Sequence, residues 1–111
     1  MEGSLMNAAP VMPNASLVVG TVQDLKSPEH GQEFPVLALL VDEAENVADL
    51  ANFCAEEVGN VIPVILQGPV HDKLLRPKAK VHLRVEFRGD EWGGGYYANT
   101  EDLKLAGDRS M

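Results

Sequence analysis

The alternating stretch at residues 80–88 constrains the fold of this chain more than any other feature of the sequence. Successive residues of a β-strand point to opposite faces of the sheet, so this stretch presents two different faces. One face is apolar and is predicted to pack in a core: Val81, Leu83, Val85 and Phe87. The other face is mostly charged and is predicted to meet water or a ligand: Lys80, His82, Arg84, Glu86 and Arg88.

The segments on both sides of this strand indicate the second half of a small Greek-key barrel. Residues 62–68 read as an apolar strand followed by a polar connection, and residues 93–95 are three glycines. Glycine permits the positive dihedral angles of a tight or bulged hairpin, after which a strand returns. Three aromatic residues, Trp92, Tyr96 and Tyr97, are therefore expected together on one protruding ribbon.

The first half of the chain supplies two further strands. Residues 17–25 are rich in β-branched side chains, which favour strands, and Gly20 lies in the middle of this segment. A glycine at such a position in a barrel allows a sharp bend or the close approach of another backbone. After a run of turn-forming residues, residues 34–41 form a compact apolar run of strand length, whose beginning Pro35 restricts to an edge or a bulge.

Between the second and third strands, the spacing predicts an α-helix over residues 43–58. Apolar residues recur there at intervals of three and four: Ala44, Val47, Ala48, Ala51, Cys54, Ala55 and Val58. Asp42 with Glu45 resembles a capping box, and Gly59 stands where a left-handed C-terminal cap is expected. The exposed side of this helix is acidic, so it would repel nucleic acid.

The length of 111 residues fits one domain. We expect a leader and flexible arm at 1–15, the folded domain at 16–107 and a tail at 108–111. Residues 1–5 resemble a cloning leader, and no apolar run reaches the roughly 20 residues of a membrane helix. We therefore expect a cytoplasmic protein without membrane contact. A single cysteine, Cys54, excludes an intramolecular disulfide.

The formal net charge of −8 argues against tight, non-specific binding to a phosphate backbone. The charges are unevenly distributed, however, because Lys26 is the only lysine or arginine before residue 61. The remaining bases are Lys73, Arg76, Lys78, Lys80, Arg84, Arg88, Lys104 and Arg109. Two interpretations stay open: a basic ligand-binding face on an acidic protein, or an ordinary solvated strand face.

The order of these segments resembles the OB-fold of bacterial single-stranded-DNA-binding proteins and of primosomal replication protein N. The resemblance covers residues 16–106 and is carried by four motifs: V-V-G-T-V-x-D-L-K-S-P-x-H-G-Q-E-F-P-V-L-A-L-L-V, I-P-V-I-L-Q-G, K-V-H-L-R-V-E-F and D-E-W-G-G-G-Y-Y. It implies a mainly β, five-stranded Greek-key OB-fold barrel, here with one inserted helix between the second and third strands. The family commonly has a β-ribbon in place of this helix, and its replicative members carry an acidic-aromatic tail that this chain lacks. The resemblance therefore implies a tailless relative that binds single-stranded DNA or RNA, as an accessory in replication, repair or transfer.

Capture of a single strand requires aromatic rings on which bases stack and cations along the phosphate path. The hairpin offers the rings of Trp92, Tyr96 and Tyr97, and alternation predicts that one of the two tyrosines faces the core. The cations are offered by the long strand and the residues that lead into it: Lys73, Arg76, Lys78, Lys80, Arg84 and Arg88. An alternative for Trp92 is a ring folded back over the barrel mouth.

The competing hypothesis is a protein-interaction OB module that docks a partner through the acidic helix or an open sheet edge. A homodimer through unpaired barrel edges is a further expectation. Catalysis is not expected, because His30, His71 and His82 are scattered and Cys54 has no base beside it. We expect no metal and no cofactor.

Overall fold

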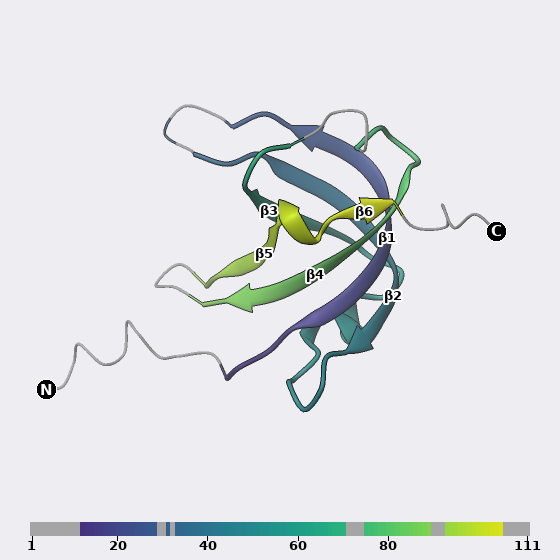
Figure 1. The fold of residues 1–111 in the computed structure, drawn as a ribbon, viewed down its shortest axis with the longest axis vertical. Helices are drawn as coiled ribbons and strands as arrows, with labels where there is room; N and C mark the ends of the chain where they lie inside the picture. Colours follow the sequence, from purple (N-terminus) through teal and green to yellow (C-terminus); the bar gives the residue numbers. More distant parts are fainter. Residues whose placement is uncertain (1–11, 29–30, 32, 71–74, 90–92, 106–111) are drawn as a thin grey trace, which may run out of the picture.

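The computed structural model describes residues 12–28, 31, 33–70, 75–89 and 93–105, which form one continuous β-sheet (Figure 1). Its strands are β1 (Ser16–Lys26), β2 (Val36–Asn46), β3 (Val61–Gln67), β4 (Lys80–Arg88), β5 (Gly95–Asn99) and β6 (Lys104–Leu105). The helical elements in the described ranges are two short 3-10 helices, η1 (Phe53–Glu57) and η3 (Thr100–Asp102). Neither is long and apolar enough to cross a membrane.

The sheet closes into a five-stranded barrel. β1 pairs antiparallel with β2 along its whole length, and its first half, Ser16 to Thr21, also pairs with β4. β3 pairs antiparallel with β2 and parallel with β5, and β5 pairs antiparallel with β4, which completes the circle. β6 adds two residues to β4. The result is a closed, mixed β-barrel consistent with an OB-fold, and the strands predicted from the sequence are confirmed.

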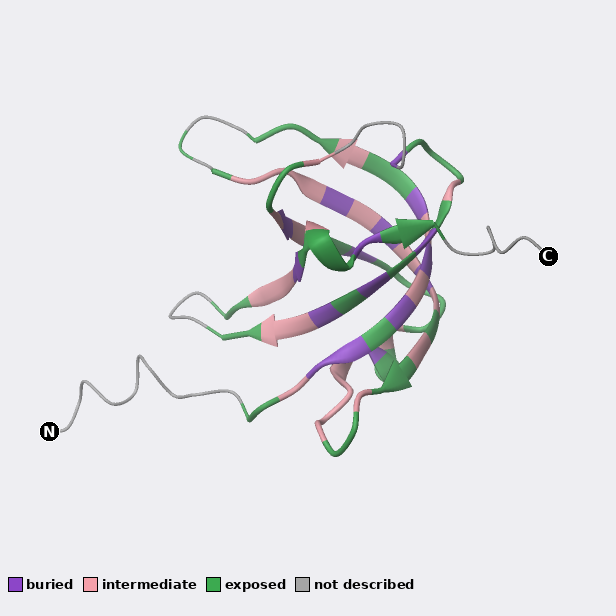
Figure 2. Cartoon of the chain, in the orientation of Figure 1, coloured by how far each residue is buried: buried purple, intermediate pink, exposed green. Residues whose placement is uncertain are grey.

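The core lies inside the barrel and follows the alternation of the strands. Figure 2 shows buried residues alternating with exposed or half-buried ones along β1, β3 and β4. The largest fully buried side chains come from the inner faces of four strands: Val18, Val22, Leu37, Leu39, Val41, Val64, Leu66, Val81, Leu83 and Val85. Phe87 was expected in this core but is only half-buried, because it lies at the end of β4 and packs against other aromatic rings.

At Gly20 the strands β1 and β2 leave no room for a side chain, which agrees with the close approach predicted for this glycine. The register of the two strands shifts between Val19 and Gly20. A Cβ atom at Gly20 would lie 2.6 Å from Leu39 Cγ and 2.8 Å from the carbonyl oxygen of Leu40. A side chain at this position would therefore collide with both the core and the backbone of β2.

The α-helix predicted over residues 43–58 is wrong. The first part of that segment continues β2, which pairs with β1 from Val19 opposite Glu43 to Ser16 opposite Asn46. A turn follows, and helical structure is limited to the 3-10 helix η1. Gly59 has the expected left-handed φ of +93°, but it serves the turn before β3 and caps no α-helix.

Two physical causes override the helical spacing. The first residues of β1 need backbone partners, and β2 supplies them by extending to Asn46. The polar residues then lock the turn: Asn52 Nδ2 donates to the Ala44 carbonyl (3.1 Å) and to Asn46 Oδ1 (3.0 Å). The buried hydroxyl of Ser16 donates to Asn52 Oδ1, and the Cys54 amide donates to that hydroxyl at 3.3 Å. A small alanine side chain suits a strand edge or a turn as readily as a helix face, so its spacing was a weak signal.

Candidate ligand-binding face

The charged row predicted on β4 faces outward. Lys80, His82, Arg84 and Arg88 are exposed and Glu86 is half-buried, while the alternate residues Val81, Leu83 and Val85 are buried. On one side of this row lie the outward residues of β1, with Leu17 opposite Arg84. On the other side lies β5, with Tyr97 opposite Glu86.

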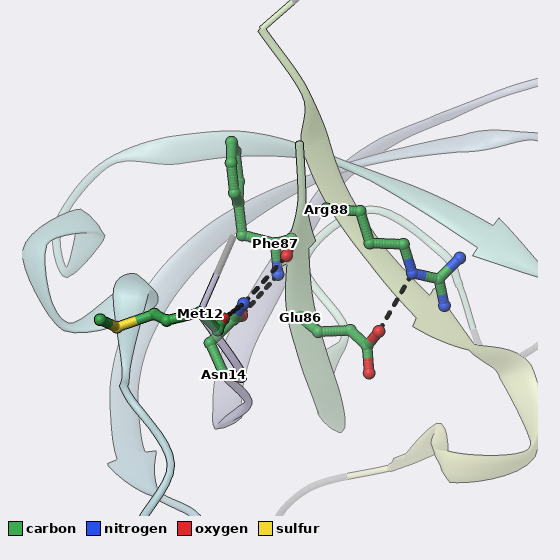
Figure 3. A network of polar contacts seen from close by, with 5 residues as sticks. All are labelled: Met12, Asn14, Glu86, Phe87 and Arg88. Carbon is green, nitrogen blue, oxygen red and sulfur yellow. Dashed lines mark hydrogen bonds and ion pairs between the residues drawn. The ribbon is translucent and has the colours of Figure 1, made fainter. Parts of the chain in front are cut away.

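Arg88 and Tyr97 form a stacked pair at the hairpin end of this row. The Arg88 guanidinium carbon lies 4.6 Å from the centroid of the Tyr97 ring, within the range of a cation–π contact. Arg88 Nε also bonds Glu86 Oε1 at 3.0 Å, an exposed ion pair that contributes little to stability. Figure 3 shows Glu86 and Arg88 reaching toward one another on the side of β4 opposite the Phe87 ring. The guanidinium plane is thus held in place over an aromatic ring.

Arg84 lies beside this pair, in a small hollow of about 230 Å³. The hollow, named here the Arg84 hollow, is lined by Arg84, Glu86, Arg88, Tyr97, Ala98, Asn99 and Asp102. With the residues that the structure describes, the Arg84 side chain forms no hydrogen bond or ion pair. The structure therefore brings three predicted site residues together: Arg84, Arg88 and Tyr97.

Lys80 is held by an acidic partner at the other end of β4. Its Nζ lies 3.1 Å from Asp42 Oδ2, and Thr21 Oγ1 donates to the same oxygen at 2.7 Å. Partial burial raises the pKa of Asp42, but the hydrogen bonds from Thr21 and Lys80 outweigh it, so the net pKa is lowered. Asp42, predicted as a helix cap, instead neutralises one cation of the proposed site.

Arg76 and Lys78 lie in the turn that precedes β4. Lys78 adopts a left-handed φ of +77°, and its amide donates to the Val22 carbonyl at 2.7 Å. At about 3.3 Å per residue, β4 separates this turn from Arg88 by roughly 27 Å. These two cations therefore lie far from the stacked pair. Lys73 and Trp92, the other predicted site residues, lie outside the described residues.

Tyr96 faces away from the Arg84 hollow, as the alternation along β5 requires. Its hydroxyl donates to Glu57 Oε2 at 3.0 Å, and its ring packs edge-on against Phe87 with centroids 5.4 Å apart. Phe87 in turn contacts Phe53 at 5.9 Å. Tyr96 thus anchors η1 to the barrel and is not available to the face that carries Tyr97.

The Tyr96 hydroxyl gives a testable pH dependence. Burial, followed by the hydrogen bond and charge of Glu57, raises the pKa of Tyr96 well above its usual value of 10.0. The folded state therefore retains this proton when the unfolded state has lost it, and stability falls as pH rises above 10. Urea unfolding at pH 8 and pH 11 should show a smaller loss for Tyr96→Phe than for the wild type. Tyr97→Phe, whose hydroxyl bonds no described residue, is the control; an equal loss in wild type and Tyr96→Phe would contradict the assignment.

Asn14 is a structural residue that the sequence did not reveal. Its amide bonds both backbone groups of Phe87: Nδ2 donates to the carbonyl at 2.9 Å, and the Phe87 amide donates to Oδ1 at 2.7 Å (Figure 3). The next residue, Ala15, is fully buried. Although residues 1–15 were predicted as a leader and arm, these last two pack on the barrel. Asn14 supplies hydrogen-bond partners to the backbone of β4 at Phe87, beyond the β4 residues that pair with β1.

Metal-ligating side chains do not cluster in the described part of the chain, where no group of three or more could hold an ion. Cys54 is a buried free thiol, and burial raises its pKa, which disfavours the thiolate. His30 and His71 lie outside the described residues, and His82 is exposed on β4.

Three comparisons with known proteins give no further assignment. No protein-family model, no curated protein and no solved structure matches this chain. The assignment of this chain therefore rests on its closed, mixed β-barrel, which is consistent with an OB-fold.

Proposed function

We propose that this protein is a non-catalytic, single-stranded nucleic-acid-binding protein of the OB-fold type described above, an accessory in replication, repair or transfer. The single observation that carries the proposal is the Arg88–Tyr97 stack beside the guanidinium of Arg84, which has no partner among the residues that the structure describes. Planar guanidinium groups bind phosphate in a bidentate way and also stack on bases. One exposed surface thus combines a phosphate ligand with a flat stacking platform.

In this proposal the strand crosses the outer face of β4 near its hairpin end. Arg84 takes a phosphate, and a base stacks on the guanidinium of Arg88 or replaces it over the Tyr97 ring. Lys80, Lys78 and Arg76 continue a cationic path toward the far end of β4, where Asp42 weakens the first of them. Trp92 and Lys73 belong to the proposal by their sequence positions alone.

Nearby carboxylates limit the affinity. Glu86 and Asp102 border the Arg84 hollow, and the whole chain carries a net charge of −8. We therefore expect a dissociation constant in the range of about 1–100 μM near physiological salt, typical of sequence-independent binding. Affinity should rise steeply as salt is lowered.

The test compares Arg84→Gln/Arg88→Gln with the wild type in fluorescence anisotropy titrations of labelled oligo-dT at several salt concentrations. We expect the double variant to bind at least about tenfold more weakly, since two phosphate or stacking contacts are lost. The slope of log affinity against log salt should fall by about 0.7 for each phosphate contact removed. Lys26→Glu carries the same charge change at the far end of β1, away from the Arg88–Tyr97 stack, and should bind like the wild type within about threefold.

Two results would count against this function. A wild-type protein without affinity for oligo-dT at the lowest salt would remove nucleic acid as the ligand. A double variant that binds as well as the wild type, with an unchanged salt slope, would remove this face from the interaction. Circular dichroism of each variant checks that the barrel is intact.

The second candidate function is the protein-interaction module. The observation that favours it is the outer face of β2 and β3, on which the central outward residues are uncharged: Val36, Ala38, Leu40, Val61, Pro63 and Ile65. The acidic helix, one of the two docking elements in this hypothesis, does not exist, and barrel closure gives each of the strands β1 to β5 a neighbour on both sides. A homodimer therefore remains a proposal for the apolar face, and a monomer in sedimentation at high concentration would discard it.

A further inference from the structure

A second hollow spans β1 and the neighbouring part of β4, and its lining includes His82 and Arg84 of the β4 row. It has a volume of about 460 Å³, inside the range of roughly 300–1,000 Å³ typical of ligand sites. Leu17 and Val19 project outward from β1 into it, and Glu45 and Glu43 are their register partners on β2. We name this hollow the β1 groove.

The part of the groove floor that β1 supplies is apolar and open to solvent, whereas the part that β4 supplies carries His82 and Arg84. Leu17 is 46% exposed, one of the few large apolar side chains on the described surface with such exposure. Backbone groups of β1 are not available for an added strand, because residues 16–21 pair with β2 on one side and β4 on the other. An occupant must therefore lie on the face of the strand and contact Leu17 through its own apolar side chain.

The side chains that line the groove carry more negative charge than positive charge. Glu43 and Glu45 form one wall, and Glu101 and Asp102 of η3 stand at the opposite wall. None of these four carboxylates forms an ion pair with a residue that the structure describes. They face two permanent cations of the same groove, Arg84 and Lys104, together with His82.

An unpaired carboxylate at the rim of an apolar groove favours a cationic partner, because opposite charges across an interface steer and orient binding. Nucleic acid is disfavoured as the occupant of the groove itself, since its phosphates would meet carboxylates on both walls, and a strand that follows the cations of β4 passes along the edge of the groove at Arg84 and His82. A second copy of this acidic chain is also disfavoured by its net charge of −8. The occupant that fits this groove is therefore a segment with an apolar side chain between basic side chains.

We infer that the β1 groove binds a peptide segment of a partner protein in which a leucine-sized apolar side chain is flanked by lysine or arginine. The apolar side chain packs on Leu17 and Val19, and the flanking cations reach Glu43 and Glu45 on one wall and Glu101 and Asp102 on the other. The two sites are adjacent, because Arg84 and Asp102 line both the β1 groove and the Arg84 hollow, whereas Leu17 and Val19 line the groove alone.

The experiment titrates the full chain with labelled hexapeptides in fluorescence anisotropy at 150 mM salt. The first probe has two leucines between pairs of basic residues; the second has serines in place of the leucines; the third has acidic residues in place of the basic ones. We expect the first to bind, the second to bind at least fivefold more weakly, and the third to show no binding. These differences separate groove binding from simple attraction between opposite charges.

Two groove variants and one control locate the site. Glu43→Lys/Glu45→Lys and, separately, Leu17→Ser should each weaken the first probe at least fivefold. Asp49→Lys/Glu56→Lys makes the same charge change on exposed residues away from the groove and should change affinity less than twofold. Because Leu17 is half exposed, its replacement by serine leaves the barrel folded even if the double charge reversal does not.

The proposal is overturned if the serine probe binds as well as the leucine probe, if Leu17→Ser binds like the wild type, or if the control weakens binding as much as the groove variant. Oligo-dT titrations of the same proteins distinguish the peptide-binding site from the nucleic-acid-binding site. Loss of peptide binding in Leu17→Ser with unchanged oligo-dT affinity supports two separate ligands. Loss of both together would assign the groove to nucleic acid and would also overturn the peptide.

Discussion

Replacing Leu66 by alanine is expected to lower the free energy of unfolding by about 2–5 kcal/mol, the usual cost of truncating a buried leucine. Leu66 is fully buried on the inner face of β3, where it pairs with Ala98 of β5. This parallel pairing closes the barrel, and the inner side chains of neighbouring strands pack closely there. The cavity left by the lost isopropyl group adds to the lost burial, because a closed ring of strands has little freedom to collapse onto it.

Val61→Ala on the same strand is the matched control. Val61 points outward and is 53% exposed, so its truncation should change the free energy of unfolding by no more than about 0.5 kcal/mol. Urea unfolding followed by circular dichroism measures both values, with the slope against denaturant compared to detect changes in the unfolded state. Equal effects of the two substitutions would contradict the inward and outward assignment of β3.

Gly20→Ala is expected to destabilise the barrel by about 1–3 kcal/mol, through overpacking and not through a cavity. The added Cβ would lie 2.6 Å from Leu39 Cγ and 2.8 Å from the Leu40 carbonyl oxygen, both closer than real Cβ contacts allow. Alanine would otherwise stabilise by reducing the entropy of the unfolded chain, so a net loss measures the collision.

Gly95→Ala and Leu39→Ala separate the causes of this loss. At Gly95 the nearest atoms to an added Cβ lie at 3.8 and 3.9 Å, an ordinary contact, so Gly95→Ala should be tolerated. In the double variant Gly20→Ala/Leu39→Ala the collision with the leucine disappears while that with the Leu40 carbonyl remains. The two substitutions should therefore be less than additive in a double-mutant cycle. Additive effects would show that β2 moves away from Gly20 as a rigid unit.

Local sequence patterns predicted most of the barrel strands, because such patterns are properties of the strand itself. In β4 the apolar residues occupy every second position, so inward and outward faces follow from the sequence without knowledge of any partner. The first strand was predicted from its β-branched residues, the third from its apolar run, and the hairpin from its three glycines. The end of β2 was not, because residues 43–46 become a strand only through pairing with β1, and a three-and-four spacing of small residues does not exclude that pairing.

The candidate site likewise combines features that the sequence predicted with features that only the structure revealed. Outward orientation of Arg84 and Arg88 could be read from the strand, and opposite facing of Tyr96 and Tyr97 followed from their adjacency. The partners of these residues could not be read, since the pairing of Lys80 with Asp42 joins residues far apart in the chain. The sequence also offered no sign that a side chain before β1 would bond the backbone of β4.

Sequence alone determined the two faces of β4 and the close approach at Gly20, because the period of a strand and the permissiveness of glycine act within a few residues of the chain. Tertiary structure alone decided which charges remain free. Asp42 comes from a different strand to meet Lys80, whereas Arg84 meets no such partner among the described residues. The tertiary structure also placed the carboxylates of β2 and η3 around Leu17. The predicted helix would have directed the β2 carboxylates, Glu43 and Glu45, to a different surface. Charge pairing across strands depends on the register of the closed sheet, and that register forms only when all five barrel strands are in place.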